Sequence, residues 1–232
     1  MYKGLKIQAP FFEIGPKAYL YGEEMLKLAQ VIDKTALKYD VDVIVTPQYT
    51  DIKLLADNTE RILVFAQHMD SLPVGRGLGS VLPEAVKAAG AVGVMLNHAE
   101  KPISMEEIEK TIKRADEVGL GTIVCADTVE DVKAIAKMSP NLIVAEPTEL
   151  IGTGQTSDSN YVLDTIRTVN EINPDIMVLQ GAGISNGQDV YNTIKLGAQA
   201  TGSTSGIIKA ADPYAMVEEM LYNLRKAWDE LH

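Results

Sequence analysis

Residues 141–154 read NLIVAEPTELIGTG, an apolar run that ends in a glutamate and continues into a loop closed by two glycines. A short and almost continuously apolar run of this kind is typical of a parallel strand whose outer face is covered by a helix. Glu146 ends the run, where partial burial would raise the pKa of its carboxyl toward the range of a general base. A solvated glutamate at the start of a loop is the alternative interpretation.

Seven further apolar runs repeat along the chain, spaced roughly 27 residues apart. They cover residues 11–14, 41–45, 62–67, 91–97, 121–126, 176–181 and 198–203. Helical stretches lie between most of them, at residues 23–39, 82–90, 104–118, 129–137, 160–172, 188–196 and 213–231. Strands that alternate with helices in this way predict an α/β protein with a single-domain (β/α)8 barrel, and a doubly wound open sheet is the competing architecture.

One helical stretch also has a start signal in the sequence. Ser104 precedes it, and Glu107 follows three residues later, which is the spacing of a capping box. The sequence therefore predicts that a helix begins directly after Ser104.

Composition excludes several classes of partner. The chain has 46% hydrophobic residues, a formal net charge of −11 and one cysteine, Cys125. An acidic surface repels phosphate backbones, so a nucleic-acid partner is not expected. A lone cysteine cannot form an internal disulfide or a multi-thiolate metal site. No apolar run approaches the length of a membrane span, so we expect a cytoplasmic protein without a membrane partner.

In a (β/α)8 barrel the chemistry lies where the strands end, so the residues after each run are candidates for the site. The fourth run is followed by His98 and Glu100, and the sixth by Glu146. His98 could polarise a carbonyl group, or it could be a structural histidine. Glycines and hydroxyl groups that follow the last three runs could present backbone N–H groups to a phosphate, or they could simply form turns.

With these motifs in view, the chain resembles the triosephosphate isomerase family in its short, archaeal-type form. The resemblance rests on TPQYTDI (46–52), FAQHMD (65–70), VLPEAVKAAGAVGVMLNHAE (81–100), EPTELIGTG (146–154), GAGIS (181–185) and STSGIIKAADP (203–213). It runs from about residue 11 to the end of the chain and implies a TIM barrel. It also implies an isomerase of a small phosphorylated sugar in carbohydrate metabolism and glycolysis. We expect no cofactor, and no metal, because His68, His98 and Glu146 lack the tight spacing of metal ligands.

The resemblance implies a role for each matching residue. Glu146 matches the family's base, His98 its neutral electrophile and Glu100 the acidic residue that follows the histidine. The segment 147–154 matches the lid that closes over substrate. The positions that match the surroundings of the substrate phosphate are Ile151, Gly152, Gly183, Thr204 and Ser205.

The family's first strand ends in Asn-x-Lys, and two registers are open here. In the preferred register, with the strand at residues 11–14, Lys17 is the catalytic lysine and Gly15 stands where the family has asparagine. Residues 1–10 are then an N-terminal extension and residues 11–232 form the barrel domain. If the strand instead begins at residues 5–9, Gln8 or Pro10 takes the lysine position and the charge is lost.

The matched segments also depart from the family pattern near the reacting carbons. Gly15 lacks the side-chain amide, Glu13 shares the inward parity of Lys17, and Ala99 replaces the usual serine. Interconversion of glyceraldehyde 3-phosphate and dihydroxyacetone phosphate is the leading hypothesis. Isomerisation of a different sugar phosphate, such as a tetrulose phosphate, and non-catalytic binding of a phosphosugar are the alternatives. The resemblance also implies a homodimer or homotetramer, with subunit contacts through HMDSLPVGRGLGS (68–80).

Overall fold

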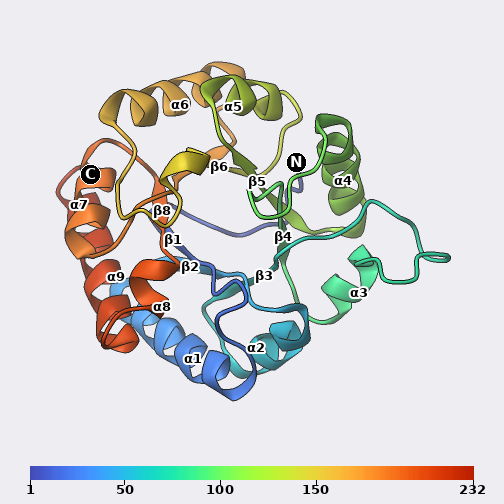
Figure 1. Cartoon of the computed structure of the whole chain (residues 1–232), viewed down its shortest axis with the longest axis horizontal. Helices are drawn as coiled ribbons and strands as arrows, with labels where there is room; N and C mark the ends of the chain where they lie inside the picture. The colour runs from blue at the N-terminus through green and yellow to red at the C-terminus, as the bar shows by residue number, and fades with distance from the viewer.

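The computed structural model describes residues 1–232, and its eight parallel strands close into one barrel ringed by helices (Figure 1). Each strand pairs with the next one in the chain, and the first pairs with the last, so no sheet edge is left free. The strands are β1 (Phe11–Ile14), β2 (Asp42–Val45), β3 (Leu63–Ala66), β4 (Gly93–Leu96), β5 (Gly121–Ala126), β6 (Leu142–Ala145), β7 (Met177–Gln180) and β8 (Ala200–Gly202). The predicted (β/α)8 barrel is confirmed.

The first strand forms in the preferred register. Phe11 pairs with Asp42 of β2 on one side and with Ala200 of β8 on the other, whereas residues 5–9 form no strand. Because side chains alternate along a strand, Phe11 and Glu13 face the barrel interior while Phe12 and Ile14 face the helices.

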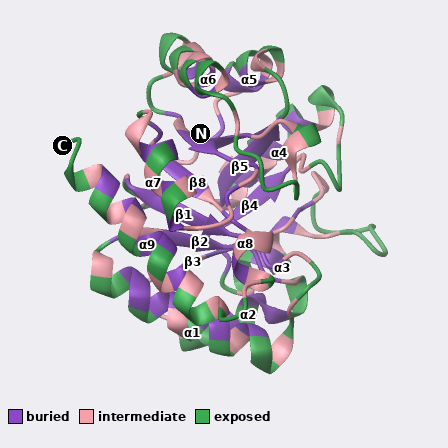
Figure 2. Ribbon diagram, turned by 60° about the vertical axis from the view of Figure 1, so that its left-hand side comes forward, coloured by how far each residue is buried: buried purple, intermediate pink, exposed green.

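Hydrophobic packing is divided into an inner and an outer layer. The outer layer lies between the strands and the surrounding helices, and the buried faces of the helices turn toward the sheet (Figure 2). The inner layer fills the barrel with Phe11, Ile44, Phe65, Met95, Ile123, Cys125, Leu142, Val144, Leu179 and Ala200. All eight strands contribute a side chain to this inner layer, so the barrel is a packed core with no pore.

The helices are α1 (Gly22–Tyr39), α2 (Ile52–Asn58), α3 (Pro83–Ala88), α4 (Met105–Val118), α5 (Val129–Ala136), α6 (Ser159–Ile172), α7 (Gly187–Lys195), α8 (Ser205–Ile208) and α9 (Pro213–Asp229), with 3-10 turns η1 (Tyr49–Asp51) and η2 (Thr148–Leu150). No helix combines the length and the apolar character that crossing a membrane requires. Most helices form where the sequence predicts them. The exceptions are α2 and α8, which span seven and four residues and were not predicted.

The capping box predicted at the start of α4 forms only in part. The Ser104 hydroxyl accepts a hydrogen bond from the Glu107 N–H at 3.2 Å. The Glu107 carboxylate accepts from the hydroxyl of Ser71 at 2.5 Å, in the loop after β3, instead of turning back to Ser104. A complete capping box begins α5, between Thr128 and Asp131.

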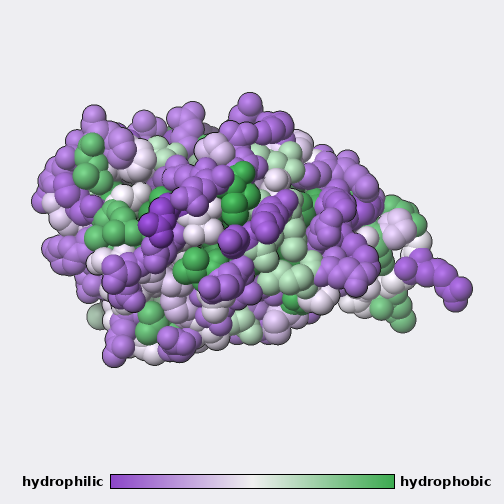
Figure 3. All heavy atoms as spheres, turned by 90° about the horizontal axis from the view of Figure 1, so that it is seen from above, coloured by the Kyte–Doolittle hydropathy of each residue, from purple (hydrophilic) through white to green (hydrophobic).

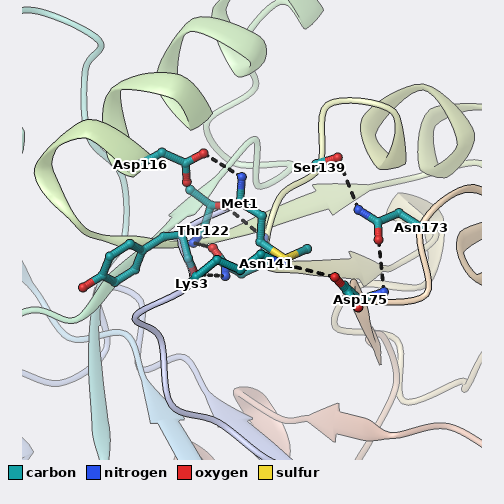
Figure 4. A network of polar contacts seen from close by, with 9 residues as sticks. Met1, Lys3, Asp116, Thr122, Ser139, Asn141, Asn173 and Asp175 are labelled. Carbon is teal, nitrogen blue, oxygen red and sulfur yellow. Dashed lines mark hydrogen bonds and ion pairs between the residues drawn. The ribbon is translucent and has the colours of Figure 1, made fainter.

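The first ten residues cross the end of the barrel at which the strands begin. Leu5 and Ile7 pack against the inner hydrophobic layer. Polar contacts hold the segment to later parts of the chain: Lys3 forms an ion pair with Asp175, and the Asn141 amide donates to the Tyr2 carbonyl at 2.8 Å (Figure 4). The segment closes the barrel at the end opposite to the candidate site.

A long loop between β3 and α3 projects from the body of the protein (Figure 1). The same projection stands out at one end of the space-filling view, where hydrophilic and hydrophobic surfaces lie side by side (Figure 3). Val74 is 69% exposed in this loop, and Leu78 is fully exposed.

The contact between Asn141 and the N-terminal segment yields a stability prediction. Asn141→Ala removes the acceptor of the buried Thr122 N–H, 3.1 Å away, together with the donor to Tyr2. Because an unpaired buried donor costs free energy, we expect the free energy of unfolding to fall by about 1–3 kcal/mol. Guanidinium denaturation followed by circular dichroism measures the change.

Asn58→Ala is the matched control, because Asn58 is exposed and lies at the end of α2. Asn58→Ala should change the free energy of unfolding by no more than about 0.5 kcal/mol. Equal stability of the two variants would show that Asn141 does not hold the N-terminal segment in place.

Candidate active site

A cavity of about 490 Å³ opens at the end of the barrel where the strands finish. Every residue that the sequence analysis assigned to the site lines this cavity: Glu13, Gly15, Lys17, His98, Glu100, Glu146, Ile151, Gly152, Gly183, Thr204 and Ser205. Glu13 lies on β1, the others lie in the segments that follow β1, β4, β6, β7 and β8, and barrel closure brings them together.

Glu146 follows β6 and has both its conformation and its ionisation set by its surroundings. Its Oε1 accepts a hydrogen bond from the Ala182 N–H at 3.0 Å. Burial raises the pKa of the Glu146 carboxyl, and this effect outweighs the opposing effects of that hydrogen bond and of Lys17. Next to it, a Cβ at Gly181 would lie 2.9 Å from the Glu146 Cβ, so a glycine is needed for this side chain to fit. The arrangement makes Glu146 a carboxylate suited to accept a proton.

His98 follows β4 and is arranged to be a neutral hydrogen-bond donor. Its Nδ1 accepts from the Glu100 N–H at 3.1 Å, which places the proton of the neutral ring on Nε2. Burial lowers the pKa of His98, and the positive charge of Lys17 lowers it further. The ring is therefore neutral at pH 7, with an N–H available to a ligand oxygen.

Lys17 supplies the positive charge of the site. Its Nζ forms an ion pair with Glu100 Oε1 at 2.7 Å, and this charge holds the pKa of the Glu100 carboxyl below its usual value. Its backbone has a φ of 50°, an uncommon conformation for a residue other than glycine. The Lys17 carbonyl accepts hydrogen bonds from the side chains of Gln48 at 2.6 Å and Gln67 at 2.9 Å, which hold this conformation.

Gly183, Thr204 and Ser205 line the side of the cavity that is formed after β7 and β8. Gly183 has a φ of 72°, and a Cβ there would lie 1.9 Å from the Gln155 carbonyl oxygen, so the loop can approach this closely only with glycine. Thr204 and Ser205 begin the short helix α8, whose first N–H groups have no partner within the helix. Such groups can bind an anion.

The segment 147–154 covers one side of the cavity as a short exposed loop. It contains η2, and both Gly152 and Gly154 have a φ of 74°. The Thr148 N–H donates to Asp127 at 2.8 Å and anchors the beginning of the loop. Ile151 and Gly152 reach the cavity, so movement of this loop would open or close it.

Sequence reasoning missed several residues of the site. Thr46, Gln48 and Gln67 follow β2 and β3, so reading the ends of these two strands would have found them. Lys209 also lines the cavity, and its ammonium group lies 5.4 Å from the centre of the Tyr19 ring. No sequence signal distinguishes Lys209 from a solvated lysine.

Comparison with known proteins gives a consistent result. Residues 14–220 match the family model described as triosephosphate isomerase. The triosephosphate isomerase of Methanobacterium bryantii is 41% identical over 211 residues, covering 89% of this chain and 93% of the relative. That of Sulfurisphaera tokodaii is 39% identical over 227 residues, covering 96% and 99%. The crystal structure of the Bartonella henselae triosephosphate isomerase has the same fold, with a TM-score of 0.75 at 14% identity over 95% of this chain and 99% of that one.

The surroundings of His98 yield a prediction about its ionisation. Because its pKa is lowered from the ordinary 6.5, the ring should be mostly neutral at pH 6.5 and carry its proton on Nε2. Nitrogen-15 NMR of histidine-labelled protein measures the tautomer, and a His98→Gln variant assigns the signal among the three histidines. A charged ring at this pH, or a proton on Nδ1, would contradict the assignment.

Proposed function

The chain belongs to the triosephosphate isomerase family and is an aldose–ketose isomerase that interconverts glyceraldehyde 3-phosphate and dihydroxyacetone phosphate, and we propose which residues carry the reaction. Isomerisation of an α-hydroxy carbonyl compound needs a base at the C–H bond and a hydrogen-bond donor at the oxygen. Glu146 and His98 have these properties, and both line the same cavity.

Glu146 is the base. It removes a proton from the carbon next to the carbonyl group, and the C–H electron pair becomes part of an enediolate. Glu146 then returns the proton to the neighbouring carbon, while the hydroxyl proton passes between the two oxygens. Its raised pKa makes it a stronger base than an exposed glutamate, and the Ala182 N–H directs one of its oxygens.

His98 and Lys17 stabilise the enediolate. The Nε2–H of His98 donates to the oxygen on which negative charge develops, and the Lys17 ammonium adds a positive charge nearby. Glu100 positions both groups, because its carboxylate binds Lys17 while its backbone N–H fixes the His98 ring. Gly15, between β1 and Lys17, lines the cavity next to these groups and would contact the substrate through its backbone.

The phosphate group is held by the backbone around Ile151, Gly152, Gly183, Thr204 and Ser205. These positions surround the cavity on the side of β6 to β8. The segment 147–154 acts as a lid, and its closure excludes water from the enediolate. Exclusion of water is useful because an enediolate phosphate readily eliminates its phosphate group.

One observation carries this assignment above the others. Burial raises the pKa of Glu146 and lowers that of His98 in one shared cavity, so a base and a neutral donor coexist at pH 7. A protein that only binds a phosphosugar would need neither the raised pKa of Glu146 nor the lowered pKa of His98. The two pKa changes therefore favour an enzyme over a non-catalytic binding protein.

A four-carbon sugar phosphate, such as a tetrulose phosphate, is a second candidate substrate. The support is that Gly15 brings no side chain to the cavity and that the Glu13 carboxyl group takes this place: a Cβ at Gly15 would lie 2.9 Å from Glu13 Oε1. A carboxyl group here offers a hydrogen bond to the additional hydroxyl group of a four-carbon substrate.

Solvent-deuterium incorporation tests the function and the base together. In D₂O, the wild-type protein should convert dihydroxyacetone phosphate and place deuterium on carbon. Proton NMR detects this deuterium. An erythrulose phosphate is tested in parallel as the second candidate substrate. Glu146→Gln should lower kcat by at least about 10²-fold, because the amide cannot accept the proton.

Glu171→Gln is the matched control, since Glu171 is an exposed glutamate of α6 outside the cavity and the lid. It should leave kcat unchanged. Exchange into the four-carbon compound alone would assign the second candidate substrate. Thermal stabilisation by these phosphates without any exchange would point to a binding protein.

We also propose a cytoplasmic homodimer or homotetramer in which residues 68–80, which include the projecting loop, contact a second copy. Leu78 is fully exposed and Val74 is 69% exposed, and contact with another subunit would remove both from water.

Leu78→Asp should therefore weaken the assembly, because a carboxylate would be buried at the contact. Size-exclusion chromatography with light scattering should show a shift toward the monomer mass of 25.2 kDa. Leu163→Asp on α6 is the control, since Leu163 is 51% exposed outside the loop. If both variants keep the wild-type mass, the loop does not hold the subunits together.

A further inference from the structure

A second carboxyl group lies on the floor of the cavity and has no part in the reaction described above. Glu13 is on β1, beside Gly202 of β8 and Ile44 of β2, with its side chain directed into the barrel above Phe11. It is only 9% exposed, yet it lines the cavity. An ionisable group in this place interrupts an otherwise apolar barrel interior.

Two glycines provide the space for this carboxyl group. A Cβ at Gly15 would lie 2.9 Å from Glu13 Oε1, and a Cβ at Gly202 would lie 3.1 Å from Glu13 Oε2. Any side chain at residue 15 would therefore compete with the Glu13 carboxyl for the same space. The glutamate and the glycine act as a pair: where Gly15 provides no polar side chain, Glu13 provides one from below.

The hydrogen bonds of Glu13 leave one oxygen available. The Thr46 hydroxyl donates to Oε1 at 3.0 Å, and no protein group donates to Oε2. A buried carboxylate needs several donors to offset the loss of water, and one hydroxyl is too few. The protonated acid suits this site better, because it can accept from Thr46 and donate an O–H into the cavity.

The surroundings of Glu13 also favour its protonated, neutral form. Burial raises the pKa of Glu13 to about 7, with a further increase from Glu146 on the β6 side, against smaller opposing effects of Thr46 and Lys17. The remaining neighbours are neutral: β8 presents Gly202, and β5 presents the Cys125 thiol, whose pKa is raised.

We propose that Glu13 is a further catalytic residue, whose protonated carboxyl group donates a hydrogen bond to the substrate oxygen that becomes negative in the enediolate. This inference rests on the proposed function. Glu13 keeps its proton throughout, so the reaction remains balanced: the carbon proton travels by Glu146 alone. A carboxylic acid kept neutral by its site is an effective donor to an oxyanion.

The proposal predicts a specific pH dependence. Ionised Glu13 cannot donate, and its negative charge would repel both the enediolate and the phosphate. Because protonated Glu13 is the active form, kcat/KM should fall as pH rises through about 7, the pKa of this group. Ionisation of the substrate phosphate and of Glu146 governs the acidic side of the profile.

Glu13→Gln and Glu13→Ala separate the role of donor from a structural role. The amide of Gln can still donate but cannot ionise, so Glu13→Gln should keep kcat within about tenfold at pH 6 and lose the decline near pH 7. Glu13→Ala should lower kcat by about 10²–10³-fold. Circular dichroism and thermal unfolding check that both variants fold, and Glu24→Gln on the exposed start of α1 is a neutral control.

Calorimetric titration with 2-phosphoglycolate provides a readout that does not need turnover, since its carboxylate resembles the enediolate. Above pH 7, wild-type protein should take up more protons on binding than Glu13→Gln, as judged in buffers of different ionisation enthalpy. Equal proton uptake, or a decline near pH 7 that persists in Glu13→Gln, would overturn the proposal. A wild-type protein that fails to exchange deuterium would instead count against the proposed function, independently of this titration.

Discussion

Closure of the sheet by the pairing of β1 with β8 is the constraint on which the rest of the structure depends. Parallel strands in a closed barrel all end at the same mouth, so loops far apart in sequence meet around one cavity. The packed barrel interior beneath the cavity also removes water from its floor. Burial is consequently the largest single effect on the pKa of Glu13, His98 and Glu146, and it acts in the direction that disfavours charge in each of them.

Within that mouth, Glu100 connects groups that would otherwise be independent. It is largely exposed, yet its side chain holds the Lys17 ammonium and its main chain determines which nitrogen of His98 carries the proton. A change in the loop after β4 would therefore alter charge placement and tautomer together. The carbonyl of Lys17, bound by Gln48 and Gln67, extends the same network to the loops after β2 and β3.

The sequence was sufficient for features that depend on local pattern. The apolar runs predicted all eight strands. Glu146 and His98 follow two of these strands closely, so their position at the mouth of the barrel was predictable from the runs. Features that depend on distant partners were not predictable in the same way. The Glu107 carboxylate binds Ser71 across a loop instead of completing its cap, and α2 is stabilised by burial of Ile52 and Leu55 and not by a repeat long enough to recognise. The partners of Glu13 likewise come from β2 and β8, so its environment became apparent only in three dimensions.

The N-terminal segment has a consequence for the order of assembly. Tyr2 and Lys3 find their partners at Asn141 and Asp175, and Phe11 pairs with Ala200, so the beginning of the chain is completed by residues synthesised much later. Contacts of such long sequence separation carry a large closure entropy and form slowly. On the ribosome, the first strand must remain without one of its two neighbours until β8 has emerged. The sheet can therefore close only late in synthesis, after seven other strands have been made.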